Sequence, residues 1–300
     1  MIGYKTMSIQ NENNYNTKND TMVNTENQTD NTELHGSEHT PTIYAERVTN
    51  IAGLNINNSF ISSFFVLLVI ITFSLLIKNK IKKIPSKIQI ILEILIEKTL
   101  ELCDNVTNNR KKTNQIFPIV ISLFLFILIN NWFGLLPGIG SIGFYENQAF
   151  VPFLRGGTAD INTTLALALS SVIGANIFGI ISIGGWNYFN KFINIKELVH
   201  GAKVIRKEPS SIIVSPIKFF VGILEIIGEF AKVTSLSFRL FGNIFAGEVL
   251  LASMAAIFAF VLPIPFIFLE VLVGFIQAFI FSMLVLVYFN IASEDHNTQH

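Results

Sequence analysis

Long apolar stretches separated by shorter polar segments make up most of this chain after residue 50. Five of them approach or exceed about 20 residues, the length that a helix needs to cross the hydrocarbon core of a bilayer. They lie at 58–77, 116–137, 161–186, 212–262 and 264–292. The fourth is about twice the length of one upright span, which predicts two segments, a membrane hairpin or a steeply tilted helix. The pattern predicts an all-α integral membrane protein with about five crossings.

Two segments outside these stretches have patterns of their own. Over 90–106, apolar residues recur at helical spacing and Glu and Lys occupy the other face, which predicts an amphipathic helix on the membrane surface. Residues 1–50 are rich in Asn and Thr and poor in large apolar side chains, so we expect a disordered tail. The predicted organisation is a tail over 1–50 followed by a membrane domain over 51–300.

Composition supports the membrane assignment and excludes several kinds of site. The chain is 51% hydrophobic and 14% charged, whereas a soluble domain has about 25% charged residues. Its single cysteine, Cys103, excludes an internal disulfide, and no Cys or His spacing suggests a metal site. The glycine-rich segment 134–143 lacks the Gly-Lys-Ser/Thr ending of a phosphate-binding loop. We therefore expect no metal, no cofactor, no bound nucleotide and no nucleic-acid partner.

The distribution of Lys and Arg predicts the orientation of the chain. The segments that follow the first and third apolar stretches are basic, as at 78–87 and 203–207. The segment 138–160 has only Arg155 against Glu146 and Asp160. Because short basic loops stay in the cytoplasm, the N-terminus is expected outside and the C-terminus inside. The amphipathic segment 90–106 then lies at the inner surface.

Ionisable residues stand out within the last two apolar stretches. They include Glu225, Glu229, Lys232, Arg239, Glu248 and Glu270. Each costs about 2.5–3.5 kcal/mol to insert on biological scales, so such residues usually pair with one another or have a function. Lys232 lies seven residues from Glu225 and three from Glu229, and an internal ion pair with either one is as plausible as a functional role.

Arg239 is the residue in this group that is hardest to explain as a structural pair. Its guanidinium group effectively never loses its proton, so it cannot pick up and pass on protons. It can hold a fixed positive charge that repels cations and attracts a carboxylate. At an effective dielectric constant near 20, a contact ion pair at about 4 Å is worth about 4 kcal/mol. Arg239 is therefore predicted to ionise a carboxylic acid that a partner brings beside it.

Helical geometry assigns the neighbouring polar residues to faces. At about 100° per residue, Ser235 and Asn243 share a face with Arg239, and Glu248 points the opposite way. In the last stretch, Glu270 and Gln277 are seven residues apart and line one stripe about 10 Å long. Carboxyl groups in such desolvated places can exchange protons near neutral pH. Together they predict a proton path interrupted by a fixed charge.

Two motifs in these stretches resemble a known family. "SLSFRLFGNIFAGE" (235–248) and "QAFIFSMLVLVYFNIASEDH" (277–296) closely resemble the signature regions of subunit a of F-type ATP synthases. "WFGLLPG" (132–138) and "TADINTTLALAL" (158–169) look like the second and third spans of the same family. The resemblance covers roughly 55–296 and leaves out the tail.

The resemblance implies a fold, partners and residue roles. It implies two long C-terminal helices, near 212–262 and 264–292, that form a tilted hairpin beside the ring of c subunits. It further implies a complete F-type ATP synthase with a b-subunit peripheral stalk in a lipid membrane. In this family, Arg239 would engage the c-ring carboxylate and prevent direct proton leak between two half-channels. The implied proton path contains Glu248, Glu270, Gln277, Asn243, Ser235, Asp160, Asn162, Glu225 and Lys232, whereas Glu229 matches no family position and has no assigned role.

Three alternatives remain open from the sequence. A cation-coupled secondary transporter would be expected to show internal repeats with charged residues in both halves. An inert membrane anchor would tolerate replacement of Arg239 by Leu. A Na⁺-coupled subunit a would differ mainly in the ring, which is another chain. An acid at Glu248, where mitochondrial members often have His, favours a bacterial plasma membrane over a mitochondrial inner membrane.

Overall fold

The computed structural model describes residues 45, 47–51, 54–79, 86–136, 138–139, 142–146, 149–186, 188, 211–258 and 261–294. Most of the tail predicted over 1–50 lies outside these residues. Its end, Arg47–Ile51, is strand β1, which pairs with β2 (Leu54–Asn57) in an antiparallel hairpin. A second hairpin joins β3 (Gly143–Glu146) to β4 (Ala149–Pro152). These two hairpins are the strands of the described chain, and the sequence did not predict them.

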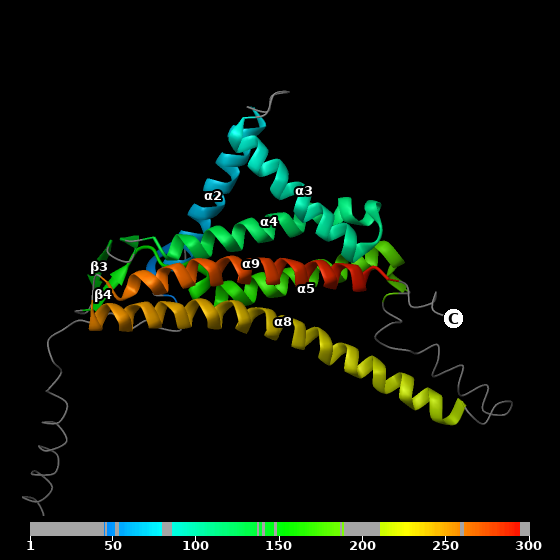
Figure 1. The fold of residues 1–300 in the computed structure, drawn as a ribbon. Coiled ribbons are helices and arrows are strands. Elements are labelled where there is room, and N and C mark those ends of the chain that lie inside the picture. The colour runs from blue at the N-terminus through cyan, green and yellow to red at the C-terminus, as the bar shows by residue number, and fades with distance from the viewer. Residues whose placement is uncertain are drawn as a thin grey trace, which may run out of the picture. The chain divides into compact units, whose positions relative to one another are not determined.

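Helices form the rest of the described structure, which confirms the all-α fold class (Figure 1). They are α2 (Asn58–Lys78), α3 (Lys87–Thr107), α4 (Arg110–Gly134), α5 (Ile161–Ile183), α8 (Ser211–Ile257) and α9 (Pro263–Ala292), with a short 3₁₀ turn, η2 (Gly157–Ala159), before α5. Five of them, all but α3, contain windows long and apolar enough to cross a membrane. The fourth apolar stretch is one helix of 47 residues, α8.

Polar side chains cap the first turns of three of these helices. Ser86 accepts a hydrogen bond from the Gln89 amide at the start of α3, over 3.4 Å. Asn109 accepts one from Lys111 at 3.0 Å before α4, and Asp160 accepts one from Asn162 at 3.1 Å before α5. Such caps satisfy amide groups that have no partner inside the first helical turn.

The long helices lie side by side. α9 packs against α4, α5 and α8, and α5 packs against α8, so α9 is at the centre (Figure 1). α8 and α9 run in opposite directions, joined near residue 260, and the first half of α8 slopes away from the other helices (Figure 1). The observed α8–α9 hairpin agrees with the fold that the resemblance implies. The core that these helices share includes Val120, Phe124, Ile127, Ala168, Val172, Leu236, Leu240, Val285, Leu286 and Phe289.

α3 has the amphipathic character predicted for 90–106. Its Cys103 is fully buried against the core, whereas Ile91 and Ile94 are 67% and 53% exposed. Burial raises the pKa of the Cys103 thiol to about 11, so the reactive thiolate is scarce at neutral pH. Where α3 turns into α4, Asn108 adopts a left-handed conformation with φ 49°. α3 thus leaves isoleucine side chains exposed, and its place at a membrane surface stays a prediction.

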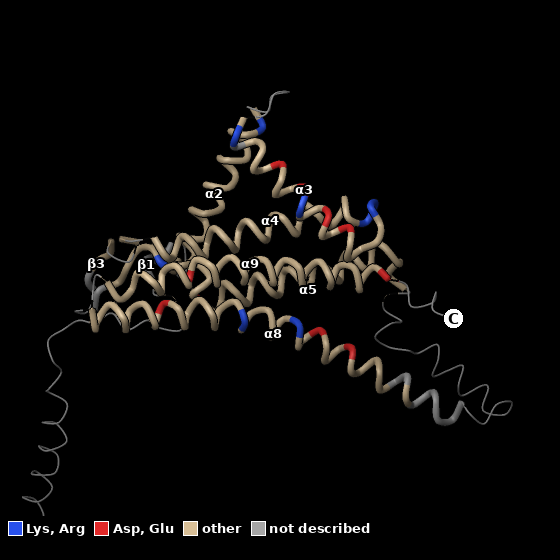
Figure 2. Tube along the Cα trace, in the orientation of Figure 1, with Lys and Arg blue, Asp and Glu red and all other residues tan. Residues whose placement is uncertain are grey.

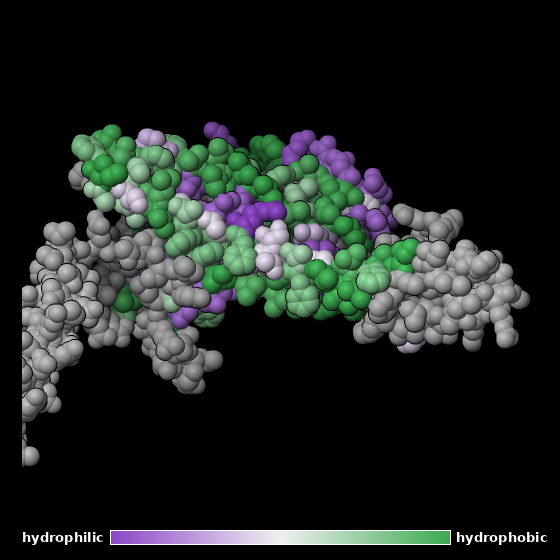
Figure 3. All heavy atoms as spheres, turned by 90° about the horizontal axis from the view of Figure 1, so that it is seen from below, coloured by the Kyte–Doolittle hydropathy of each residue, from purple (hydrophilic) through white to green (hydrophobic). Residues whose placement is uncertain are grey.

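Charges are unevenly distributed over the helices. Figure 2 shows Lys, Arg, Asp and Glu mainly on α3, at its turn into α4, and on α8. The face seen in Figure 3 is largely hydrophobic, with a hydrophilic group near its middle. Along α8, Leu224, Phe230 and Phe238 are 63%, 73% and 57% exposed. The polar residues of α8 therefore interrupt a hydrophobic surface.

Candidate functional site

Arg239 lies on the exposed surface of α8. Its Nη2 donates to the Ser235 hydroxyl, one turn earlier, at 3.3 Å. Within the described parts of the chain, no carboxylate forms an ion pair with this guanidinium group. The fixed positive charge predicted from the sequence is therefore exposed and has no acid of its own helix bundle beside it.

Gln277 connects Arg239 to α9. This buried side chain donates from Nε2 to the main-chain oxygen of Arg239 at 2.7 Å. Its Oε1 accepts a hydrogen bond from Asn243 Nδ2 at 2.9 Å. The structure therefore brings together Arg239, Asn243 and Gln277, as the helical spacing and the resemblance predicted, and the amide of Gln277 sets where α8 sits on α9.

Glu248 is held by an arginine that the sequence analysis considered only as a loop charge. Arg155 Nε and Nη2 donate to Glu248 Oε1 and Oε2 at 3.1 and 2.7 Å, which is a bidentate pair. The Arg155 side chain is 8% exposed and that of Glu248 is 34% exposed. The main-chain amide of Arg155 donates to Ser62 of α2 at 3.1 Å, which anchors the loop. The sequence signal for Arg155 was that it is the one basic residue in 138–160.

Glu270 is buried but lies in a different environment. It is 6% exposed, and none of the described residues gives it a hydrogen bond or an ion pair. Its carboxyl group lies against Gly247, where a methyl group on Cα would overlap it. Glu248 and Glu270 line one cavity of about 200 Å³ between α4, α8 and α9. The two acids therefore share a space, one paired with an arginine and the other not.

Asn131, a residue that the sequence analysis did not single out, also lines this cavity. Its amide donates to the Gly274 carbonyl of α9 at 3.0 Å and accepts from the Thr158 hydroxyl at 2.7 Å. Two adjacent asparagines, Asn130 and Asn131, within an apolar stretch were the signal that could have found it.

Asp160 and Asn162, which the resemblance places in the proton path, lie together at the start of α5. Asp160 is 2% exposed, and its Oδ1 accepts from the Asn162 main-chain and side-chain nitrogens at 3.1 and 3.2 Å. This is the geometry of a helix cap, and the cavity that Glu248 and Glu270 share does not include them. Their place in a proton path stays a prediction.

A second polar group lies on the first half of α8. Lys232 Nζ lies 2.6 Å from Glu229 Oε1, so Glu229, one of the two partners left open by the sequence, forms an ion pair with it. The same ammonium group lies 5.2 Å from the centre of the Tyr288 ring on α9. Asn176 of α5 donates to Glu229 Oε2 at 3.3 Å. Side chains from α5, α8 and α9 thus meet around the Lys232–Glu229 pair.

Comparison with known proteins assigns the family. The sequence pattern of the ATP synthase A chain family matches residues 60–290. The chain belongs to the ATP synthase subunit a family. An ATP synthase subunit a from Geotalea daltonii is 32% identical over 227 residues, 75% of this chain and 83% of that protein. Those from Syntrophobacter fumaroxidans and Gloeobacter violaceus are 33% and 30% identical over 228 and 242 residues, covering 75% and 81% of this chain and 79% and 86% of theirs.

Family membership confirms the resemblance found in the sequence. This subunit a is a multi-pass membrane protein with a role in ATP synthesis and ion transport, as the proton-channel subunit of the membrane sector of an F-type ATP synthase. Membership of this family excludes two alternatives that the sequence left open, a secondary transporter and an inert membrane anchor. The match begins at residue 60 and so leaves out the tail predicted over 1–50.

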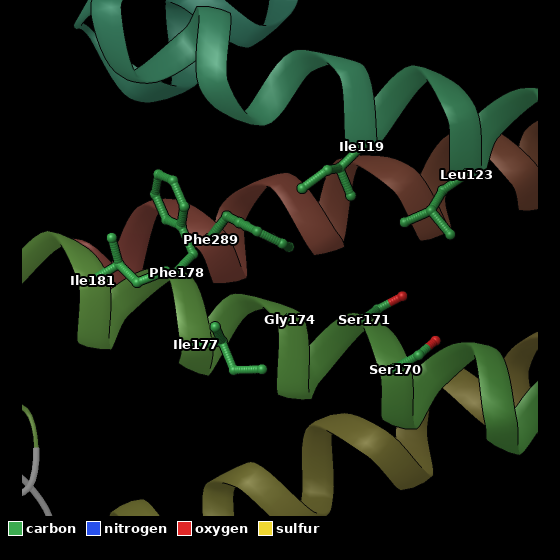
Figure 4. Close-up of a pocket in the computed structure, with 9 residues that line it drawn as sticks. All are labelled: Ile119, Leu123, Ser170, Ser171, Gly174, Ile177, Phe178, Ile181 and Phe289. Atoms are coloured by element: carbon green, nitrogen blue, oxygen red, sulfur yellow. The ribbon is translucent and has the colours of Figure 1, made fainter. Parts of the chain in front are cut away.

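A second cavity of the described chain differs from the acid-lined one. It has a volume of about 320 Å³ and lies between α4, α5 and α9, lined by side chains such as Ile119, Ile177 and Phe289 (Figure 4). Its hydroxyl groups, Ser170 and Ser171, both donate to the Leu167 carbonyl, at 3.0 and 2.7 Å. No ionisable residue lines it. The ionisable residues discussed above thus lie at the Glu248–Glu270 cavity and along α8, and not at this one. No metal-binding cluster of His, Cys, Asp or Glu occurs in the described ranges.

Proposed function

We propose that this chain is the stator subunit that loads and unloads protons on the carboxylates of a c-subunit ring through two half-channels, with Arg239 blocking direct passage between them. The observation that carries the proposal is the exposed Arg239 side chain, for which the described chain supplies no acid. A charge in such a place needs a carboxylate from elsewhere, because lipid cannot solvate it. A moving ring of carboxylates meets that need.

The chemistry of arginine explains how the block works. Arg239 keeps its proton at any relevant pH, so it cannot relay protons from one half-channel to the other. A ring carboxylate that arrives within about 4 Å is favoured in its ionised form by about 4 kcal/mol, at an effective dielectric constant near 20. The carboxylate therefore releases its proton before it passes the arginine and gains one after it. Net proton flow then requires rotation of the ring.

The acid-lined cavity is proposed as the inner end of the outer half-channel. Glu248 and Glu270 line it together, so a proton can move between two carboxyl groups within one desolvated space. Asn243 and Gln277 lie between this cavity and the arginine, because Gln277 bonds to both Asn243 and the Arg239 main chain. Asp160 and Asn162 are proposed at the outer entrance. Ser235 and Glu225 are proposed on the inner side. Lys232, which is paired with Glu229, is proposed beside this path and carries no proton along it.

The surroundings of the subunit follow from the same proposal. The α8–α9 hairpin would lie against the c ring, a b-subunit peripheral stalk would hold the subunit in place, and lipid would cover the remaining apolar surface. The charge distribution supports an N-terminus outside and a cytoplasmic C-terminus. The relatives named above are from bacteria, which supports a bacterial plasma membrane.

Replacement of Arg239 tests the proposal. In membranes that contain the complete ATP synthase, Arg239→Ala should abolish proton-driven ATP synthesis, a loss of at least about 100-fold. The amount of assembled complex should not change, because the side chain makes one long hydrogen bond to Ser235. Arg110→Ala, which removes an exposed arginine at the start of α4, is the matched control and should keep synthesis. Retained synthesis in Arg239→Ala would contradict the role given to Arg239.

A further inference from the structure

Lys232 and Arg239 lie on the same stripe of α8. They are seven residues apart, so their side chains point within about 20° of each other and their Cα atoms are about 10 Å apart along the axis. Ser235 lies between them on that stripe. A ring that slides along this face would therefore meet two positive groups, one at each height.

Lys232 and Arg239 have different surroundings in the structure. Lys232 Nζ forms an ion pair with Glu229 at 2.6 Å and lies over the Tyr288 ring at 5.2 Å. Its side chain is 27% exposed and that of Glu229 is 18% exposed. Arg239 is exposed and has no acid among the described residues. One charge is thus neutralised within the subunit and the other is not.

Glu229 is itself held in place from a neighbouring helix. Asn176 of α5 donates from Nδ2 to Glu229 Oε2 at 3.3 Å. The Tyr188 hydroxyl donates to Asn176 Oδ1 at 2.6 Å, which leaves the Asn176 nitrogen to face the carboxylate. Both carboxylate oxygens of Glu229 therefore have a donor, one from Lys232 and one from α5. Unlike Glu248, which shares a cavity with Glu270, Glu229 lines neither of the two cavities described above. This position suits Glu229 to hold a charge rather than to move a proton.

We propose that Glu229 is a positioning residue that neutralises Lys232, so that Arg239 is the one unpaired cation on this stripe of α8 among the described residues. This inference rests on the proposed stator function. Without Glu229, the Lys232 ammonium group would attract ring carboxylates at a second height, about 10 Å from Arg239. It would also repel protons near the inner half-channel. Glu229 therefore acts on ring carboxylates only through Lys232, and it carries no proton.

A pair of single and double variants tests this role in complete ATP synthase in inverted membrane vesicles. Glu229→Gln keeps the shape of the side chain but exposes the Lys232 charge, and proton-driven ATP synthesis should fall ~10-fold. Glu229→Gln combined with Lys232→Gln removes both charges, and synthesis should return to within about twofold of the unmodified enzyme. A merely structural role of Glu229 would not be restored by also removing its partner. Immunoblots and detergent extraction must show equal amounts of assembled complex.

Three outcomes overturn the inference: full synthesis in Glu229→Gln, a double variant as slow as Glu229→Gln, or loss of synthesis that follows loss of assembly. The second of these would mean that Glu229 has a structural or proton-carrying role that does not depend on Lys232. Arg239→Ala, measured in the same vesicles, separates this inference from the proposed function. If Arg239→Ala is inactive and the double variant is not rescued, the stator function stands and the neutralisation of Lys232 fails. If Arg239→Ala retains synthesis, the stator function fails as well.

Discussion

Arg155 and Lys232 form ion pairs with acids of α8, whereas Arg239, which lies between these two pairs along the helix, forms none in the described chain. Arg155 pairs with Glu248 and Lys232 pairs with Glu229, and both cations are largely shielded, with 8% and 27% of the side chain exposed. Arg239 is exposed and, in the described chain, unpaired. In a soluble protein an exposed arginine needs no explanation, because water solvates it. Lipid cannot solvate a charge on a membrane helix, so the contrast is informative: the two enclosed cations are paired with acids, and the third is exposed without one in the described chain.

The largest effect is expected when Arg239, like Arg155 and Lys232, is given an acid partner within the chain. Ser235→Asp would place a carboxylate where the Ser235 hydroxyl now accepts from Arg239 at 3.3 Å. An internal pair worth about 4 kcal/mol would compete with the ring carboxylate. We expect proton-driven ATP synthesis to fall at least about 100-fold in membrane vesicles.

Ser235→Asn is the control for this variant, because it keeps a polar group of similar size to aspartate without the charge. It should retain most of the activity. Similar activity in the Asp and Asn variants would show that the absence of a charge beside Arg239 is unimportant.

The next largest effect distinguishes the role of the Arg155–Glu248 ion pair from that of the Lys232–Glu229 pair. Glu248→Gln should slow proton-driven ATP synthesis about tenfold or more, because it removes an acid from the cavity shared with Glu270. The additional change Arg155→Gln should not restore the rate, in contrast to the rescue expected for the Glu229–Lys232 pair. The measurement is ATP synthesis at a fixed proton gradient. Recovery in the double variant would mean that Glu248 only neutralises Arg155.

The smallest effect is expected from adding a methyl group at Gly247, in the space that the Glu270 carboxyl group occupies. Gly247→Ala would force the Glu270 carboxyl group to move, and such overpacking costs about 1–3 kcal/mol. We expect a lower unfolding temperature of the purified chain in detergent and a several-fold slower synthesis. Gly228→Ala is the matched control on the same helix, because its added methyl group meets no atom within 4 Å. If both variants are equally stable, Glu270 does not depend on Gly247.

Much of the fold was predictable because it depends on regular periodicity. The apolar stretches gave five helices suited to cross a membrane, and the spacing of Ser235, Arg239 and Asn243 placed them on one face. Such inferences need only the geometry of one helix. The length of α8 was also visible, although its single helix was one of three options left open.

The contacts between distant segments were not predictable in the same way. Arg155 and Glu248 are 93 residues apart, and Arg155 follows strand β4 in a segment without periodicity. Its direction depends on the hydrogen bond to Ser62 of α2, which no local pattern indicates. The hydrogen bond from Asn176 of α5 to Glu229, the partner of Lys232, is likewise indicated by no local pattern. Pairings of this kind are decided by packing, and the sequence supplies only the candidates.

The hydrogen bond from Gln277 to the main-chain oxygen of Arg239 has a mechanical consequence. Any lateral pull on the guanidinium group is transmitted to its own backbone, and from there across the 2.7 Å bond into the neighbouring helix. α9 is the helix that contacts α4, α5 and α8. In the proposed function, the load of a turning ring would therefore pass from Arg239 into α4, α5, α8 and α9, and the height of the charge along α8 would stay constant under that load.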